Sequence, residues 1–341
     1  MIEFLSKLVR CEHLSEEEAS RAMEIIMRDD ATPSQIAGLI IALRVKGETV
    51  EEIAGMARTA MAMATPIDVP DPETLLDVVG TGGDGSHSFN ISTISAVVAA
   101  ACGARVAKHG NRAATSSCGA ADVLEALGVR IDLPPAAVAA CVREVGIGFL
   151  FAPHYHPSFR FAGVPRRELG VRTVFNVLGP LCNPAGAGCR ALGVADATLA
   201  PKMAEALVRL GVRRTLVFNA EGLDELSTAG PSLVIELLDG ERRQHQLDPA
   251  ELGLRAASPA DLRGGDPAHN AGIARAILAG ERGPRRDIVL LNASAALRAA
   301  GLAADWRDGI GMAADAIDRG AAGDLLDRWV AASRAAVAPQ P

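Results

Sequence analysis

The chain of 341 residues has few aromatic side chains, which make up only 3% of the sequence, with two Trp and one Tyr. Proteins that bind single-stranded nucleic acid stack bases on aromatic rings, so this scarcity disfavours that class. Basic residues are also in the minority, since 34 Lys and Arg face 41 Asp and Glu and the net charge is −7. Because a general nucleic-acid binder needs a basic surface, nucleic acid is not an expected partner.

Cysteine pairs of the C-x-x-C type are absent, which removes the usual signal for a zinc site or a thioredoxin-like redox site. The six cysteines fit a reducing cytoplasm, and this is the expected location. The first residues, M-I-E-F-L-S-K-L, lack the basic region and long apolar segment of a secretory signal. Other apolar runs are interrupted by charge or glycine before they could span a bilayer, so no membrane association is expected.

The first 65 residues contain helix signals only. A helix N-terminus is indicated wherever Ser or Thr is followed three residues later by Glu or Gln. These capping boxes are Ser15 with Glu18, Thr32 with Gln35, and Thr49 with Glu52. They predict helices over 19–27, over 34–46 and from 49 to near Pro66. Helices this short form only a small core, so we expect them to pack on the rest of the chain and on a second subunit.

From Leu75 onward, strand and helix patterns alternate, which is typical of a mainly parallel sheet. Strands are predicted at 75–79, 104–107, 129–131, 146–151, 191–194 and 215–219, with a hairpin formed by 233–238 and 245–247. Helices are predicted at 93–102, 120–127, 135–145, 201–210, 270–278, 287–299 and 315–330. The expected fold class is α/β, with a small helical N-terminal domain (1–70, joined by part of 155–185) and a larger α/β domain (71–341). The proline-rich stretch 66–73 is the expected hinge.

Two stretches of the α/β part combine a strand pattern, a loop of small polar residues and an alanine-rich helix pattern. Their loops are Gly80–Gly85 and the segment 108–117. Glycines let the backbone approach a ligand, and the loop amides and helix N-terminus face negative charge. Lys108 and Arg112 in the second loop are phosphate-binding residue types. Two such loops predict a substrate with more than one phosphate group.

The first loop also satisfies G-x-G-x-x-G, which makes a dinucleotide site the first alternative. That site needs an acidic residue about 20 positions further on, at the end of the next strand. The corresponding region reads R-V-A-K-H-G and is basic, so the dinucleotide reading is disfavoured. The Walker A pattern fails because no Lys follows the last glycine. A tight turn without a ligand would need neither Asp84 nor N-I-S-T at 90–93.

On the sequence alone, the other candidate residues each allow two interpretations. Asp224 and Glu225 form either a surface acidic pair, which is the favoured reading, or a Mg²⁺ site completed by substrate phosphates. His154 and His156 lack an evident third ligand for zinc. Arg166 could bind a carboxylate through both guanidinium nitrogens or lie on an exposed helix face. The segment that starts at Lys108 could also be a solvated charged loop.

In its motifs and in their order, the chain resembles the anthranilate phosphoribosyltransferases over nearly its whole length. The motifs are G-T-G-G-D-G at 80–85, N-I-S-T at 90–93, K-H-G-N-R at 108–112, G-A-A-D-V-L-E-A-L-G at 119–128, H-P at 156–157, R-T-V-F-N-V-L-G-P-L at 172–181, G-L-D-E-L-S at 222–227 and G-G-D-P-A-H-N-A at 264–271. Several long motifs in the same order are much more specific than a single G-x-G-x-x-G.

The resemblance implies an α/β domain of the nucleoside phosphorylase and phosphoribosyltransferase type, and a homodimer joined through the helical domain. It also implies the second step of tryptophan biosynthesis from chorismate. In that reaction, the phosphoribosyl group of 5-phosphoribosyl 1-pyrophosphate passes to the amine of anthranilate. The products are N-(5-phosphoribosyl)anthranilate and pyrophosphate, and Mg²⁺ is the implied cofactor.

The resemblance also implies roles for individual residues. The expected catalytic residues are Lys108, His109, Asp224 and Glu225. Phosphoribosyl pyrophosphate is expected at Gly80, Gly83, Asp84, Ser88, Asn90, Ile91, Ser92, Thr93, Lys108, His109, Gly110, Asn111, Arg112, Ala113, Ala114, Thr115, Ser116 and Ala120. Anthranilate is expected at Gly80, Asn111, His156 and Arg166, and Mg²⁺ at Ser92, Asp224 and Glu225.

Two departures from the family pattern affect the expected phosphate contacts. Ser117-Cys118 stands where the family often has Lys-Ser, and His87 stands where it usually has a small residue. Two alternative functions are a pyrimidine nucleoside phosphorylase, whose glycine loop also binds an anion, and a non-catalytic homologue that binds nucleic acid. The K-H-G-N-R motif together with Arg166 favours the anthranilate enzyme over the first, and the acidic balance speaks against the second.

Overall fold

A computed structural model describes residues 1–113 and 117–336. Its α-helices are α1 (Ile2–Val9), α2 (Glu16–Met27), α3 (Pro33–Lys46), α4 (Val50–Ala62), α5 (Ile91–Ala101), α6 (Ala120–Leu127), α7 (Pro135–Glu144), α8 (Ala152–Tyr155), α9 (Gly163–Leu169), α10 (Phe175–Leu181), α11 (Ala200–Arg209), α12 (Pro259–Leu262), α13 (Pro267–Leu278), α14 (Pro284–Ala299), α15 (Trp306–Asp318) and α16 (Ala321–Ala335). Short 3₁₀-helices are η1 (Pro72–Thr74), η2 (Pro157–Ala162) and η3 (Pro249–Leu252).

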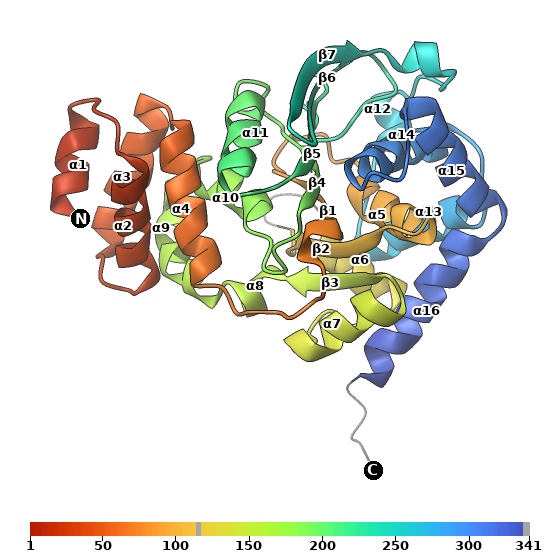
Figure 1. Ribbon diagram of the computed structural model, residues 1–341, viewed down its shortest axis with the longest axis horizontal. Coiled ribbons are helices and arrows are strands. Elements are labelled where there is room, and N and C mark those ends of the chain that lie inside the picture. Colours follow the sequence, from red (N-terminus) through yellow and green to blue (C-terminus); the bar gives the residue numbers. More distant parts are fainter. Residues whose placement is uncertain (114–116, 337–341) are drawn as a thin grey trace.

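One seven-stranded sheet runs through the larger part of the molecule (Figure 1). Its strands are β1 (Leu75–Gly80), β2 (Arg105–Gly110), β3 (Ile147–Phe151), β4 (Cys189–Gly193), β5 (Arg214–Asn219), β6 (Ser232–Leu238) and β7 (Glu241–Leu247). The order is β3-β2-β1-β4-β5-β6-β7, in which β1 to β5 pair in parallel and β6 and β7 are antiparallel. The predicted α/β fold with a mainly parallel sheet is therefore confirmed.

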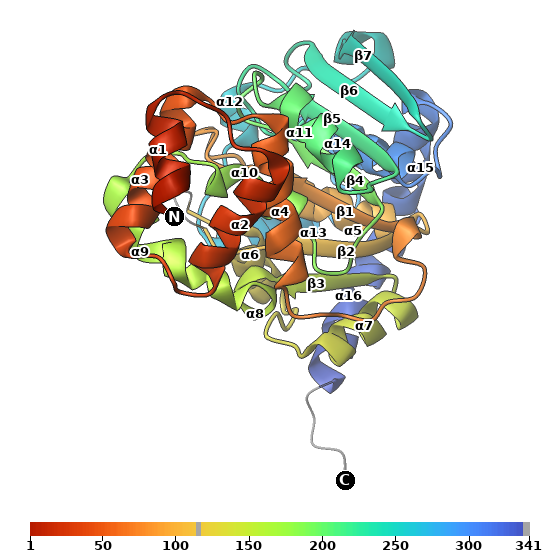
Figure 2. The same ribbon diagram turned by 60° about the vertical axis from the view of Figure 1, so that its left-hand side comes forward.

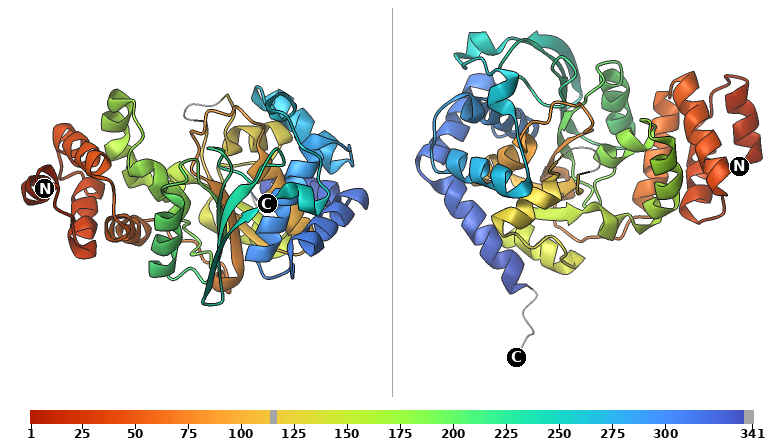
Figure 3. Two further views of the ribbon diagram at one scale, coloured as in Figure 1. Left: turned by 90° about the horizontal axis from the view of Figure 1, so that it is seen from above. Right: turned by 180° about the vertical axis from the view of Figure 1, so that it is seen from behind.

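The two faces of the sheet belong to two hydrophobic clusters, because successive side chains of a strand point to opposite faces. On β5, Leu216 and Phe218 lie in the cluster that contains α5 and α13 to α16. Val217, between them, lies in the cluster that contains α1 to α4, α10 and α11. The helical bundle α1–α4 therefore shares a hydrophobic cluster with one face of the sheet, and it forms one end of the molecule (Figure 3).

The bundle helices begin where the sequence predicts. All three capping boxes are formed, with reciprocal bonds between the Ser or Thr side chain and the Glu or Gln three residues later. The first helix, α1, was not predicted. The segment from α8 to α10 lies against the bundle (Figure 2): η2 contacts α2 and α3, α9 contacts α3, and α10 contacts α4.

Two predicted elements are wrong. The stretch 129–131 lies between Gly128, the C-cap of α6, and Pro134 before α7, and it is irregular because it pairs with no strand among the described residues. The predicted helix over 315–330 is two helices, since Gly320 has a positive φ of 75° and separates α15 from α16. The predicted hairpin between β6 and β7 is confirmed, with Asp239 and Gly240 both at positive φ in its turn.

No described helix is both long and apolar enough to cross a membrane. The six cysteines all lie within the described residues and form no disulfide.

A buried ion pair stabilises the start of α4 and provides a test of the bundle. Glu52 is fully buried and accepts bonds from the Lys46 ammonium (2.8 Å) and from the backbone N–H groups of Thr49 (2.8 Å) and Leu14 (2.9 Å). Removing one partner of a buried pair leaves the other charge uncompensated, which costs about 3–5 kcal/mol. We expect Glu52→Ala to lower the free energy of unfolding by that amount in urea titrations followed by circular dichroism.

The matched control is Glu51→Ala, the preceding residue of α4, whose ion pair with Arg209 is exposed to solvent. It should change the free energy of unfolding by less than about 1 kcal/mol. Equal effects of the two substitutions would contradict the assignment of Glu52 as the buried anchor of the bundle.

Candidate active site

The candidate site lies at the carboxyl ends of the parallel strands, where β1 and β4 finish beside each other with Gly80 opposite Gly193. The glycine loop that follows β1 (residues 80–85) turns through Gly82, Gly83 and Gly85, whose φ angles are +67°, +68° and +71°. Such angles strain any residue with a Cβ, so the sequence of this loop dictates its shape. In open α/β sheets, ligands bind at this edge.

Asp224 crosses the ends of both strands in close contact with the backbone. Its Oδ2 accepts a 2.6 Å bond from the N–H of Gly82. A Cβ on Gly80 would lie 2.3 Å from that oxygen, and a Cβ on Gly193 would lie 1.7 Å from the carbonyl oxygen of Asp224. Only glycine at both positions lets the acidic pair 224–225 reach the glycine loop.

Three carboxylates gather at this point. The N–H of Ser92, in the first turn of α5, donates a 3.0 Å bond to Glu225. Burial, and next the charge of Asp84, raise the pKa of Asp224. Burial, and next the charge of Asp224, raise the pKa of Glu225 well above its ordinary value. The site therefore has an excess of buried negative charge that a cation would relieve.

The donor set fits Mg²⁺ better than a softer metal, since it consists of carboxylates and the Ser92 hydroxyl. Within the described residues, no group of three or more His, Cys, Asp or Glu side chains is arranged to hold a metal ion. The carboxylates would have to share such an ion with water and with substrate oxygens, which is the usual arrangement for Mg²⁺.

Lys108 supplies a buried cation beneath the site. It lies on β2, two residues before the strand ends at Gly110, and its ammonium donates a 2.5 Å bond to the carbonyl of Val78. Burial lowers the pKa of Lys108, and the charges of Asp77, Glu225 and Asp224 oppose that shift. The carboxylates of the acidic pair are thus within electrostatic reach of this lysine.

Asp77 lies fully buried in the middle of β1 and connects the neighbouring strands. Its Oδ1 accepts a 3.0 Å bond from the N–H of His109 on β2. On the other side it pairs in register with Arg190 of β4. Burial raises the pKa of Asp77, and the buried Arg190 guanidinium is the strongest opposing influence. This charge fixes the backbone that carries Lys108 and His109.

His109 and His156 face each other with ring centroids 5.3 Å apart. Each is held by a backbone carbonyl: His109 Nδ1 lies 3.2 Å from that of Gly179, and His156 Nε2 lies 2.8 Å from that of Cys182. Burial, and next the neighbouring His156, lower the pKa of His109 to about 3. Burial also lowers the pKa of His156. Both rings are therefore neutral at neutral pH.

Ring contacts extend from this histidine pair to Arg166 on α9. His156 stacks on Phe159 (5.2 Å), Phe159 meets Phe175 edge to face (5.6 Å), and the Arg166 guanidinium lies 5.3 Å from the Phe175 ring. Within the described part of the chain, the Arg166 guanidinium forms no hydrogen bond or ion pair, and burial lowers its pKa. An aromatic wall thus ends at a half-buried cation, which suits an aromatic carboxylate.

Arg112 and Ala113 of the second loop contact α6. Arg112 pairs with Asp122 (2.9 Å) and Glu125 (2.5 Å) and lies 5.6 Å from the Phe151 ring. Asn111 is exposed, and the N–H of Ala113 bonds to Asp122. Gly110 is the last residue of β2, and Ala120 is the first residue of α6. Ala114, Thr115 and Ser116 lie outside the described residues.

Several residues around the start of α5 are fixed by burial and by hydrogen bonds. Ile91 and Thr93 are buried, and Ser88 forms a bridge with Arg263. Asn90 is fixed by the amide of Asn270 (2.9 Å) and donates to the carbonyl of Cys118 (3.2 Å).

The two departures from the family pattern lie near this helix start. His87 is exposed, with a φ of +54°. Ser117 is exposed, and Cys118 is buried with its sulfur 3.4 Å from Asn90 Oδ1.

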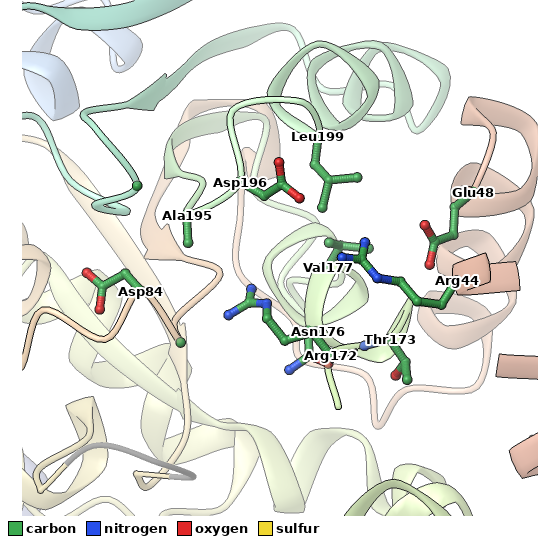
Figure 4. Close-up of a pocket in the computed structure, with 12 residues that line it drawn as sticks. Arg44, Glu48, Asp84, Arg172, Thr173, Asn176, Val177, Ala195, Asp196 and Leu199 are labelled. Atoms are coloured by element: carbon green, nitrogen blue, oxygen red, sulfur yellow. Dashed lines mark hydrogen bonds between the residues drawn. The ribbon is translucent and has the colours of Figure 1, made fainter. Parts of the chain in front are cut away.

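A cavity of about 250 Å³ lies between the bundle and the glycine loop (Figure 4). Several of the polar residues that line it have no role predicted from the sequence. Arg172 donates a 2.5 Å bond to the carbonyl of Gly82. Arg44 and Glu48 come from the end of α3, and Asp196 from the loop after β4. The motif R-T-V-F-N contains Arg172, but its partner is a backbone carbonyl 90 residues earlier, for which the sequence carries no signal.

Comparison with known proteins gives consistent results. Family models described as the helical bundle domain and the a/b domain of a glycosyl transferase family match residues 2–64 and 72–323. Anthranilate phosphoribosyltransferase 2 of Streptomyces coelicolor is 59% identical over 321 residues, covering 94% of this chain and 96% of that protein.

Solved structures agree as well. That of the Thermus thermophilus anthranilate phosphoribosyltransferase superposes with a TM-score of 0.92, at 47% identity over 97% of this chain and 99% of the other. Structures of the Saccharomyces cerevisiae enzyme, one in complex with phosphoribosyl pyrophosphate and Mg and one, a variant, with 4-fluoroanthranilate, give TM-scores of 0.89 and 0.86. These two are 29% and 28% identical to this chain and cover 98% of it and 98% of their own chains.

The close approach of Asp224 to the strand ends can be tested through Gly193. An added Cβ would displace backbone atoms, so we expect Gly193→Ala to lower the melting temperature by at least about 2–4 °C. Gly272 in α13 is the control, since no atom lies within 4 Å of its added Cβ and Ala favours a helix. Gly272→Ala should leave the melting temperature unchanged or raise it. Equal behaviour of the two variants in differential scanning calorimetry would show that residue 193 is not crowded.

Proposed function

The chain belongs to the anthranilate phosphoribosyltransferase family, and we propose that the edge of the sheet described above is where it performs that reaction. The enzyme, which acts in tryptophan biosynthesis, transfers the phosphoribosyl group of 5-phosphoribosyl 1-pyrophosphate to anthranilate. The bond from ribose C1 to the pyrophosphate oxygen breaks, a bond from C1 to the amine nitrogen forms, and the amine loses a proton. Family membership leaves no support for the nucleoside phosphorylase or for a non-catalytic nucleic-acid binder.

One observation carries the placement: the acidic pair, the glycine loop and the buried Lys108 converge on the same strand ends. We assign phosphoribosyl pyrophosphate to the glycine loop, the start of α5 and the second loop. These comprise Gly80, Gly83, Asp84, Ser88, Asn90, Ile91, Ser92, Thr93, Lys108, His109, Gly110, Asn111, Arg112, Ala113, Ala114, Thr115, Ser116 and Ala120. Arg112 would have to exchange its contacts with Asp122 and Glu125 for phosphate oxygens.

Stabilising the departing pyrophosphate is the main catalytic task, because the C1–O bond breaks with oxocarbenium character. We assign this task to the loop amides and to Lys108, whose ammonium gains a stronger partner than the Val78 carbonyl when an anion binds. Ser92, Asp224 and Glu225 would hold Mg²⁺, which when bound neutralises charge on the pyrophosphate. The raised pKa values of the acidic pair mark the need for that cation.

Anthranilate fits the aromatic wall. We propose that Arg166 binds its carboxylate and that Gly80, Asn111 and His156 line its position. An aryl amine is largely unprotonated at neutral pH, so it needs orientation more than a strong base. His109, neutral and with a pKa near 3, therefore acts by hydrogen bonding and shape rather than as a strong general base.

A homodimer through the bundle is a further part of the proposal. Ile2 and Val9 on α1 and Val45 on α3 are 72%, 76% and 82% exposed, and α1 contacts α3. A second copy of the bundle would cover this apolar surface. Sedimentation velocity should show a dimer that Val45→Glu weakens, and a monomeric parent protein would refute it.

We further propose the domain division at about residue 70 and a cytoplasmic location.

The first experiment follows anthranilate fluorescence over time with protein, phosphoribosyl pyrophosphate and Mg²⁺. Loss of signal that requires all three components supports the proposed site and reaction. A flat trace with folded protein would refute them.

Arg166→Ala should raise the KM for anthranilate by about 10- to 100-fold, because a charge-assisted hydrogen bond contributes about 1.5–3 kcal/mol. The KM for phosphoribosyl pyrophosphate should stay within about threefold, since the residue is assigned to the carboxylate alone. Arg167→Ala, the exposed neighbour on α9, is the control and should change neither value. Equal increases in both KM values would reject the carboxylate role of Arg166.

Asp224→Asn should raise the Mg²⁺ concentration for half-maximal activity at least about tenfold, because one anionic ligand is lost. Its thermal stability should not fall, since the change removes charge repulsion and keeps an acceptor for the N–H of Gly82. Glu241→Gln on β7 is an exposed control. Unchanged activity of Asp224→Asn at limiting Mg²⁺ would remove Asp224 as a ligand.

A further inference from the structure

Arg172 connects the helical bundle to the glycine loop. Its backbone precedes α10, whose residues Phe175 and Leu178 belong to the same hydrophobic cluster as the bundle. Its side chain crosses to the other wall of the cavity, toward the loop that carries Asp84 (Figure 4). The guanidinium forms no ion pair within the described residues, and its one hydrogen bond there is to the carbonyl of Gly82.

That bond orients the following peptide. A trans peptide is planar, with its C=O and N–H pointing in opposite directions. Because Arg172 holds the carbonyl of Gly82 at 2.5 Å, the N–H of Gly83 must point away from Arg172. Among the described residues, none accepts a hydrogen bond from the N–H of Gly83, Asp84 or Gly85. The loop thus presents consecutive backbone donors without protein partners, an arrangement suited to an anion.

The preceding peptide is fixed independently, because Asp224 accepts from the N–H of Gly82 at 2.6 Å. Gly82 is therefore held at its carbonyl from the bundle side and at its N–H from the sheet side. The space beside Gly83 is also filled by Arg172, since a Cβ there would lie 1.9 Å from Nη1 of the guanidinium. The positive φ of Gly83 and the position of Arg172 thus depend on each other.

The surrounding charges fit a role for this cation near the substrate. Asp196 lies on the opposite side of the cavity, and Arg44 approaches from α3. The pKa of Asp196 is lowered chiefly by its bonds to Thr198, with smaller contributions from Arg44 and Arg172. Arg172 is thus close enough to act on charge in the cavity, while the only hydrogen bond of its guanidinium among the described residues is to the loop.

We propose that Arg172 is a positioning residue for the pyrophosphate end of phosphoribosyl pyrophosphate, acting through the backbone of Gly82 and Gly83. Its bond to Gly82 sets the direction of the backbone N–H donors of the loop, so this direction depends on the position of the bundle. The inference rests on the proposed function, because it takes that substrate as the ligand of the loop.

The test compares Arg172→Met, which keeps an unbranched side chain but has no donor, with Arg172→Lys, which keeps a charged donor. We expect Met to raise the KM for phosphoribosyl pyrophosphate at least about tenfold, the loss of one charge-assisted bond, with the KM for anthranilate within about threefold. Lys should recover most of the loss. Arg167→Met is the control and should match the parent protein.

A double-mutant cycle with Gly83→Ala separates positioning from general damage. Because the Ala Cβ would collide with Arg172, Gly83→Ala should cost less affinity in the Arg172→Met background than in the parent. Strictly additive effects would overturn the proposal, as would equal increases in both KM values or an unchanged KM for phosphoribosyl pyrophosphate in Arg172→Met. Thermal melting of each variant shows whether it folds. If Arg172→Met does not fold, the KM of Arg172→Lys for phosphoribosyl pyrophosphate tests the proposal alone.

Failure of the proposed function would be visible separately. If the parent protein shows no turnover, calorimetric titration of phosphoribosyl pyrophosphate with Mg²⁺ still compares the parent with Arg172→Met. Binding that weakens in the variant supports the positioning role. Equal binding, or no binding to the parent protein, overturns it.

Discussion

The contact between Asp224 and the paired glycines at the ends of β1 and β4 is the constraint on which the site depends. Adjacent parallel strands lie about 4.8 Å apart, and residue 224 crosses both ends with its carboxylate against Gly80 and its main chain against Gly193, so neither position has room for a Cβ. Gly80 and Gly193 provide that space, and the N–H of a third glycine, Gly82, donates a hydrogen bond to the carboxylate. The glycine loop is thus in direct contact with the acidic pair that we propose as the Mg²⁺ ligands.

Charged side chains are buried in β1 and in the strands on either side of it. Asp77, Lys108 and Arg190 are buried together, and both Oδ2 of Asp77 and Nε of Arg190 lack a hydrogen-bond partner among the described residues. The unpartnered ring nitrogens of His109 and His156 lie next to the same strand ends. Unsatisfied buried groups each cost stability, and natural proteins keep them chiefly where function needs them. Of these groups, the ring nitrogens of His109 and His156 belong to the histidine pair that we propose lies beside anthranilate.

Much of the framework could be predicted from the sequence, because its signals are local. Capping boxes fix the bundle helices, and the glycine loop follows β1 as its pattern indicates. The prediction at 129–131 failed because an apolar run does not reveal whether a neighbouring strand is available. Arg172 had no role assigned because its partner is a main-chain carbonyl, which has no residue type. The ring contacts from His156 to Arg166 likewise depend on tertiary packing.

The placement of β4 beside β1 has a consequence for how the protein is made. Strands β1, β2 and β3 are complete by residue 151, but the central pairing needs Cys189–Gly193, and Asp224 follows later still. A growing chain therefore carries β1 with one unpaired edge, which is a template for pairing with other chains, and a glycine loop that still lacks its contact with Asp224. Contacts this distant in sequence form slowly, so this edge of β1 stays open to other chains until β4 has been made.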